Sequence, residues 1–85
     1  MRKYFVKTNI MSNLYAINKQ VNSFDIHADV KQGRYVVDIN SILGLFALDW
    51  SIGVTIEFLS ESPDNEAFID FLRGLLDIEV TEVNE

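Results

Sequence analysis

The single histidine of the chain lies between two aspartates in an alternating segment. Asp25, His27 and Asp29 occupy every second position, so in a β-strand all three side chains would project from one face. Imidazole and carboxylate groups together can hold a metal ion, and an imidazole can accept a phosphoryl group. The middle of a strand, however, provides no helix N-terminus to hold a phosphate. We therefore interpret the three residues as the solvated face of a half-buried strand, with neither a metal site nor a catalytic residue.

A second candidate is Ser41, which stands directly before the apolar residues 42–48. Its hydroxyl is suited to capping a short helix, and it would also be a substrate for a protein kinase. A phosphate there would face the positive end of the helix dipole. Asp38, three residues earlier, would oppose the added negative charge. The two interpretations, a structural cap and a modification site, are compatible.

The apolar residues after Ser41 form a candidate docking patch for a partner protein. Ile42, Leu43 and Phe46 would lie on one side of a short helix, and an exposed apolar patch of this kind often marks an interaction site. The alternative is that a small domain buries all three. Trp50 would either extend the patch or cover the edge of the core. The opposite side of the helix carries two residues that we expect in the core, Leu45 and Leu48.

Composition excludes several classes of function. The chain has 85 residues, 48% of them hydrophobic, which predicts one domain (residues 1–85) with a thin core. It contains no Cys, and its net charge of −6 argues against binding to nucleic acid or to anionic membranes. No apolar run is long enough to span a membrane and no signal peptide is recognisable, so we expect a cytoplasmic protein. Neither a glycine-rich phosphate loop nor a catalytic triad can be assembled, and we expect no cofactor.

The elements that position these residues alternate between strands and helices. Four segments alternate apolar and polar side chains as strands do: residues 3–8, 24–30, 34–39 and 53–60. Three segments have helical spacing or helix caps: residues 11–23, 41–48 and about 62–77. Residues 78–85 alternate weakly and predict either a short extra strand or a frayed end.

Two of the helices have recognisable starts. Ser12 is the predicted N-cap of the first helix. Ser62 is the predicted N-cap of the last, with Pro63 in its first turn. Five residues are predicted to form the buried stripe of that last helix: Ala67, Phe68, Phe71, Leu72 and Leu75. The resulting order is β-α-β-β-α-β-α, which predicts an α+β fold with a four-stranded antiparallel sheet and three helices on one face.

This order of elements and several short segments resemble HPr, the phosphocarrier protein of the bacterial sugar phosphotransferase system. The resemblance covers roughly residues 3–76 and is strongest in "NSILGLFAL". That segment is similar to the family's regulatory-serine pattern, Lys-Ser-Ile-Met-Gly-Leu/Val-Met-Ser-Leu. Ser41 falls on the regulatory serine, Ile42 on the isoleucine, Gly44 on the glycine, and Leu43 and Phe46 on the two methionines. The resemblance implies the HPr-like open-faced β-sandwich and an exposed docking helix.

The chain departs from HPr at the phosphocarrier site. The family carries its phosphoryl group on a histidine that opens the first helix, with an arginine two residues later. The matching positions here are near Ile10 and Ser12, so the active-site position is degenerate. Residues 1–26 contain no His, and no Arg occurs between Arg2 and Arg34. Without a nucleophilic nitrogen and a neighbouring guanidinium, phosphocarrier chemistry should be absent.

The resemblance therefore implies a regulatory or docking protein that is not an enzyme. Its partners would be the HPr kinase/phosphorylase acting on Ser41, a LacI-type catabolite-control regulator, and components of the phosphotransferase system. It would resemble the catabolite-repression paralogue of HPr, which also lacks the carrier histidine. The alternative is an HPr-like module that is never phosphorylated and binds a partner, or a second copy of itself, constitutively.

Overall fold

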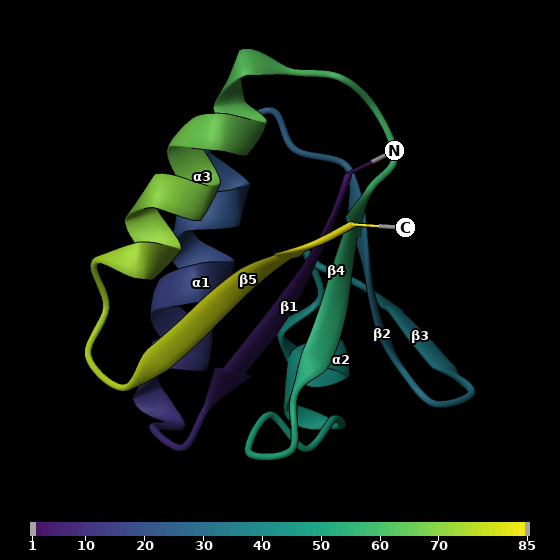
Figure 1. Ribbon diagram of the computed structural model, residues 1–85, viewed down its shortest axis with the longest axis vertical. Coiled ribbons are helices and arrows are strands. Elements are labelled where there is room, and N and C mark those ends of the chain that lie inside the picture. The colour runs from purple at the N-terminus through teal and green to yellow at the C-terminus, as the bar shows by residue number, and fades with distance from the viewer. Residues whose placement is uncertain (1, 85) are drawn as a thin grey trace.

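The computed structural model describes residues 2–84 and contains five strands and three helices in that range. Figure 1 shows the helices α1 and α3 on one side of the sheet. The elements run in the order β1 (Lys3–Thr8), α1 (Ser12–Ser23), β2 (Ala28–Gln32), β3 (Tyr35–Asp38), α2 (Ile42–Phe46), β4 (Val54–Phe58), α3 (Pro63–Arg73) and β5 (Ile78–Val83). No helix in this range is long and apolar enough to cross a membrane.

The five strands form one antiparallel sheet in the order β3-β2-β4-β1-β5. The prediction of an α+β fold with an antiparallel sheet is confirmed, but the prediction of four strands is wrong. The additional strand is the C-terminal segment, for which the sequence left strand and frayed end open. Pairing decides between them, because β5 aligns all six of its residues with β1 and places Val80 beside Val6 and Ile78 beside Thr8. Ile78 and Val80 then pack against the core.

Alternating side chains divide the sheet into a covered face and an open face. The covered face of β1 and β4 is buried, and residues of all three helices join it in one core. On these two strands it consists of Tyr4, Val6, Thr8, Val54, Ile56 and Phe58. On the open face, the Lys31 ammonium donates a hydrogen bond to the Glu57 carboxylate at 2.5 Å. A sheet buried on one side only explains why the strands alternate so regularly.

The last helix begins as its sequence predicts. The Ser62 hydroxyl accepts a hydrogen bond from the Asp64 N–H at 3.2 Å, and Pro63 occupies the first helical position. The predicted buried stripe is partly wrong, since Ala67 is exposed and Ile69 is buried. The helix buries one side of each turn and leaves the other in water. Its fully buried apolar residues are Phe68, Ile69 and Leu72, while Phe71 and Leu75 are partly buried.

The hairpin formed by β2 and β3 is shorter than predicted. The strand expected at residues 24–30 begins only at Ala28, so His27 lies just before it. Gly33 has a φ of 59° and is followed by Arg34, which has no positive φ. A positive φ at the first of two central turn residues is the requirement of a type II′ hairpin turn, which glycine meets without strain.

Candidate docking surface

Ser41 caps the short helix α2. Its hydroxyl accepts a hydrogen bond from the Gly44 N–H at 3.1 Å, and its own N–H donates to the Asp38 carbonyl at 2.9 Å. The predicted cap is therefore confirmed. The serine is also exposed, and the Asp38 carboxylate lies nearby, where it accepts a hydrogen bond from the Asn40 N–H at 2.9 Å. A phosphate on Ser41 would add negative charge beside this carboxylate.

The apolar residues of α2 reach the surface to different extents. Leu43 is 81% exposed, whereas Ile42 and Phe46 are half-buried. The Phe46 ring also meets the ring of Tyr15 on α1, with a centroid separation of 5.0 Å and a tilt of 59°. We name these four residues, Tyr15, Ile42, Leu43 and Phe46, the α1–α2 surface. It combines an exposed aliphatic side chain with a fixed aromatic pair, which is suited to burial against another protein.

Sequence reasoning missed Tyr15 as a member of this surface. The residue follows the buried Leu14 on α1 and is 64% exposed. The available signal was an aromatic residue on the solvent side of an amphipathic helix. That signal does not show which other element the ring would meet.

Trp50 does not belong to the docking surface, because it is only 1% exposed. Of the two positions that the sequence left open, the structure places it in the core. Its indole N–H donates to the Leu45 carbonyl at 2.8 Å, which ties the residue to the end of α2. Leu45 and Leu48 are buried as predicted. The prediction that Trp50 extends the docking patch is therefore wrong: the ring is buried, and its hydrogen bond satisfies the one polar atom that burial would otherwise leave unpaired.

The position matching the family's phosphocarrier histidine lies in the loop before α1 and contains no imidazole. Ile10 is half-buried, and Ser12 is exposed at the first position of α1. The prediction that Ser12 caps this helix is wrong, since Met11 is the N-cap and no side chain caps it. The Thr8 hydroxyl instead accepts a hydrogen bond from the Ile10 N–H at 3.2 Å. The cap is lost because Ser12 itself lies within the helix.

This loop is fastened to the connection between α3 and β5. The Thr8 hydroxyl donates to the Asp77 carbonyl at 2.6 Å and accepts from the Asn13 amide at 3.0 Å. The same amide donates to the Leu76 carbonyl at 2.8 Å. With one donated and two accepted bonds, the hydrogen-bonding capacity of the hydroxyl is filled. Asp77 adopts a left-handed φ of 53°, which this bonding holds in place.

His27 lies in solvent directly before the first residue of β2. Its side chain is 66% exposed, and its Nε2 atom is 3.3 Å from an oxygen of Asp25. Asp29 lies in β2 in register with Asp38 and Glu57. Within residues 2–84, no cluster of three histidine or acidic side chains has a geometry suited to a metal ion.

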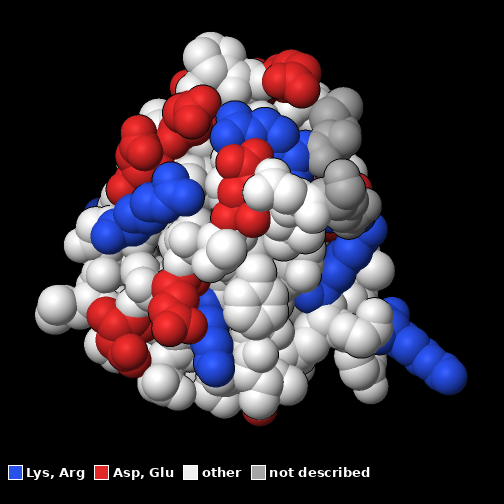
Figure 2. Space-filling view, in the orientation of Figure 1, with Lys and Arg blue, Asp and Glu red and all other residues white. Residues whose placement is uncertain are grey.

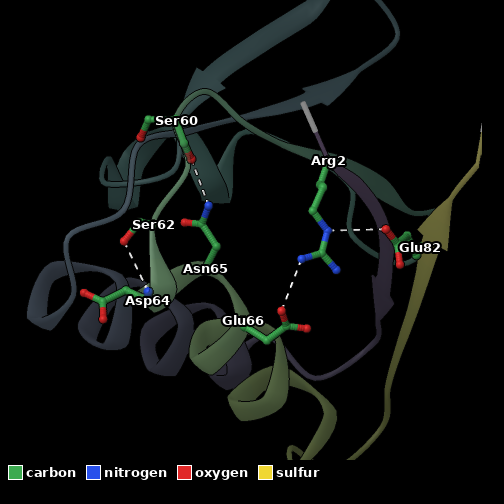
Figure 3. A network of polar contacts seen from close by, with 7 residues as sticks. All are labelled: Arg2, Ser60, Ser62, Asp64, Asn65, Glu66 and Glu82. Carbon is green, nitrogen blue, oxygen red and sulfur yellow. Dashed lines mark hydrogen bonds and ion pairs between the residues drawn. The ribbon is translucent and has the colours of Figure 1, made fainter.

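An open pocket lies at the N-terminus of α3, and Figure 3 draws most of its polar lining residues together with Asp64 and Glu82. Its lining residues include Arg2, Ser60, Asn65 and Glu66. The Asn65 amide nitrogen donates to the Ser60 carbonyl at 2.8 Å, while its oxygen is buried without a hydrogen-bond partner. In Figure 3 that oxygen lies on the side of the amide away from Arg2. The unpaired Asn65 oxygen thus does not face Arg2, so the two groups do not converge on a common ligand. We therefore regard the α1–α2 surface, and not this pocket, as the candidate site.

Comparison with known proteins adds no assignment. No protein family model matches the chain, and no curated protein or solved structure matches it.

Proposed function

We propose that the protein is an HPr-like docking protein of the cytoplasm that does not carry a phosphoryl group. The observation that carries the proposal is the exposure of Leu43, at 81%, beside the paired rings of Phe46 and Tyr15. Leaving a leucine in water gains nothing for folding, whereas covering it on a partner would be favourable. The relation to HPr is supported by "NSILGLFAL" and by the order of the first seven elements. The strand β5 is an addition to that order.

The absence of phosphocarrier activity is supported by the loop before α1. Ile10 offers no nucleophile, and the hydroxyl of Thr8 is fully hydrogen-bonded. The test is incubation with enzyme I of the phosphotransferase system and phosphoenolpyruvate, with His27→Gln as the control variant. We expect no phosphohistidine in either protein. Acid-labile phosphate on the unmodified protein that is missing from His27→Gln would contradict the proposal.

Docking is tested with two variants of matched exposure. Leu43→Asp places a charge in the α1–α2 surface, and Leu76→Asp places one at another leucine that is also 81% exposed. Binding to a LacI-type catabolite-control regulator would be measured by calorimetry. We expect Leu43→Asp to weaken binding at least tenfold and Leu76→Asp to leave it within about twofold. Equal effects of the two variants would refute the assignment of the surface.

A serine switch is the second candidate function, favoured by the exposed hydroxyl of Ser41 five residues before Phe46. The HPr kinase/phosphorylase with ATP would then add one phosphate, and Ser41→Ala would abolish the addition. Mass spectrometry measures both. If no phosphate is added, the switch is absent and docking is constitutive. The repulsion between a phosphate and Asp38 favours this constitutive form.

Self-association through the same surface is the remaining alternative. Analytical ultracentrifugation of the purified protein distinguishes it from docking to a different protein. A dimer that Phe46→Asp dissociates would assign the α1–α2 surface to a second copy of the chain. A monomer at all concentrations leaves the surface for another protein.

A further inference from the structure

The negative charge of the chain is concentrated in its last quarter. Residues 61–85 contain eight of the thirteen acidic residues and one of the seven basic residues, a net charge of −7. Residues 1–60 carry a net charge of +1. Figure 2 shows Asp and Glu side chains gathered over α3 and β5 on the face in view. Arg2, Lys3 and Lys7 lie on the β1 side of β5 and offset part of this charge, so the remaining acidic excess is open to a basic partner at the outer edge of β5.

The same region ends in an edge strand. The strand β5 pairs with β1 along all six residues and has no strand on its other side within the described chain. Every second N–H and C=O group of an edge strand points outward and is available to another strand. The devices that block such an edge include a proline, a bulge and charged side chains. Residues 78–83 contain no proline and pair without interruption, and their charged side chains are the two glutamates Glu79 and Glu82. Like charge on an approaching strand is therefore repelled, whereas a basic strand is not.

The two glutamates of β5 lie on opposite faces of the sheet. Glu79 is in register with Lys7 on the open face, and Glu82 is in register with Tyr4 on the covered face. Glu82 also accepts a hydrogen bond from Arg2 at 3.4 Å (Figure 3). Each glutamate therefore has a basic residue on its inner side. A strand added on the outer side would bring one further residue next to each of them.

Charge selects against a second copy of the same strand. Two chains, each of net charge −6, would repel one another. A second β5 would also bring two further glutamates to an edge that already carries Glu79 and Glu82. The edge is therefore suited to an oppositely charged strand.

We propose that β5 binds an extended basic segment of another protein, which adds to the sheet as a sixth strand. Because Glu79 and Glu82 are three residues apart, the segment would carry two lysines or arginines three residues apart, one for each face. The residues between them would lie beside Val80 and Thr81, and β-branched side chains would suit these positions. Backbone hydrogen bonds would supply affinity, and the two charge pairs would supply specificity. This inference does not depend on the α1–α2 surface.

The test measures binding of the capped hexapeptide Val-Lys-Val-Thr-Lys-Val to the full chain through changes in the backbone amide NMR shifts of the protein. We expect shifts centred on residues 77–84. We expect the double variant Glu79→Lys/Glu82→Lys to reduce affinity at least tenfold, and the peptide with Glu in place of both lysines to bind that variant instead. The control Glu61→Lys/Asp70→Lys changes the net charge equally but leaves β5 intact, and should bind the original peptide within about threefold of the unmodified protein.

Two further peptides separate strand addition from general attraction. A peptide of the same composition with its lysines adjacent, and one with N-methylated valines that cannot donate backbone hydrogen bonds, should both bind at least fivefold more weakly. Equal binding of these peptides, equal loss in the two double variants, or shifts at α1 and α2 would overturn the proposal. Dimerisation of the protein through β5 alone would also overturn it. None of these outcomes affects the phosphotransfer and docking tests above.

Discussion

Two leucines in α2, two residues apart, should lose very different amounts of stability on the same truncation. Leu43 is 81% exposed, and Leu45 is fully buried. Leu43→Ala removes a side chain that already lies mostly in water. Leu45→Ala removes one from the core and leaves a cavity. The pair therefore tests directly whether α2 is oriented with its apolar surface toward solvent.

The expected magnitudes follow from burial. A fully buried leucine contributes about 1.5–3 kcal/mol relative to an exposed one, so the buried fifth of Leu43 contributes roughly half a kcal/mol or less. Truncating Leu45 should cost about 2–5 kcal/mol. For a domain of this size, 1 kcal/mol corresponds to a shift in Tm of about 4–8 °C. We therefore expect Leu43→Ala to lower Tm by less than about 4 °C and Leu45→Ala by at least about 8 °C.

The measurement is urea and thermal unfolding followed by tryptophan fluorescence. Trp50 is the only tryptophan and is 1% exposed, so its emission reports the loss of the core. Circular dichroism provides a second probe that does not depend on Trp50 and its neighbour Leu45. A similar loss of stability in both variants would mean that Leu43 is buried. That result would refute both the orientation of α2 and the proposed docking surface.

Three further predictions concern stability elsewhere. Gly53 has a φ of 101°, and a Cβ atom there would lie 2.0 Å from the Phe5 ring. Gly53→Ala should therefore lower the free energy of unfolding, measured in urea, by more than about 1 kcal/mol. A neutral effect would contradict this turn geometry. The hydrogen bond from Lys31 holds the pKa of Glu57 below its usual value. The ion pair therefore stabilises the fold above the unfolded-state pKa of about 4.3 and loses that contribution as pH falls through the lowered pKa. The difference in unfolding free energy between the unmodified protein and Glu57→Gln should shrink on acidification, and a pH-independent difference would exclude the ion pair as its cause. Asn13→Ala removes two hydrogen bonds made by a buried amide and should cost about 1–3 kcal/mol, with faster hydrogen exchange in β5; unchanged exchange would show that the amide does not hold the two loops together.

Local patterns predicted much of this fold. The limits of β1, the caps at Ser41 and Ser62, and the burial of Leu45 agree with the sequence predictions. These features depend on side-chain alternation and on contacts within about four residues, which short segments of sequence contain. The distribution of charge between the two parts of the chain is likewise fixed by the sequence.

The remaining features depend on which elements meet. The bond from Thr8 to Asp77 joins residues 69 positions apart, and the pairing of β5 with β1 is equally distant in sequence. The burial of Trp50 and the contact between Tyr15 and Phe46 follow from how α1, α2 and the sheet pack. A weakly alternating tail becomes a strand only when a partner edge is available. The sequence alone therefore determined the local elements and the absence of histidine from residues 1–26. Tertiary packing decided which apolar residues remain at the surface, because burial is a property of neighbours distant in sequence.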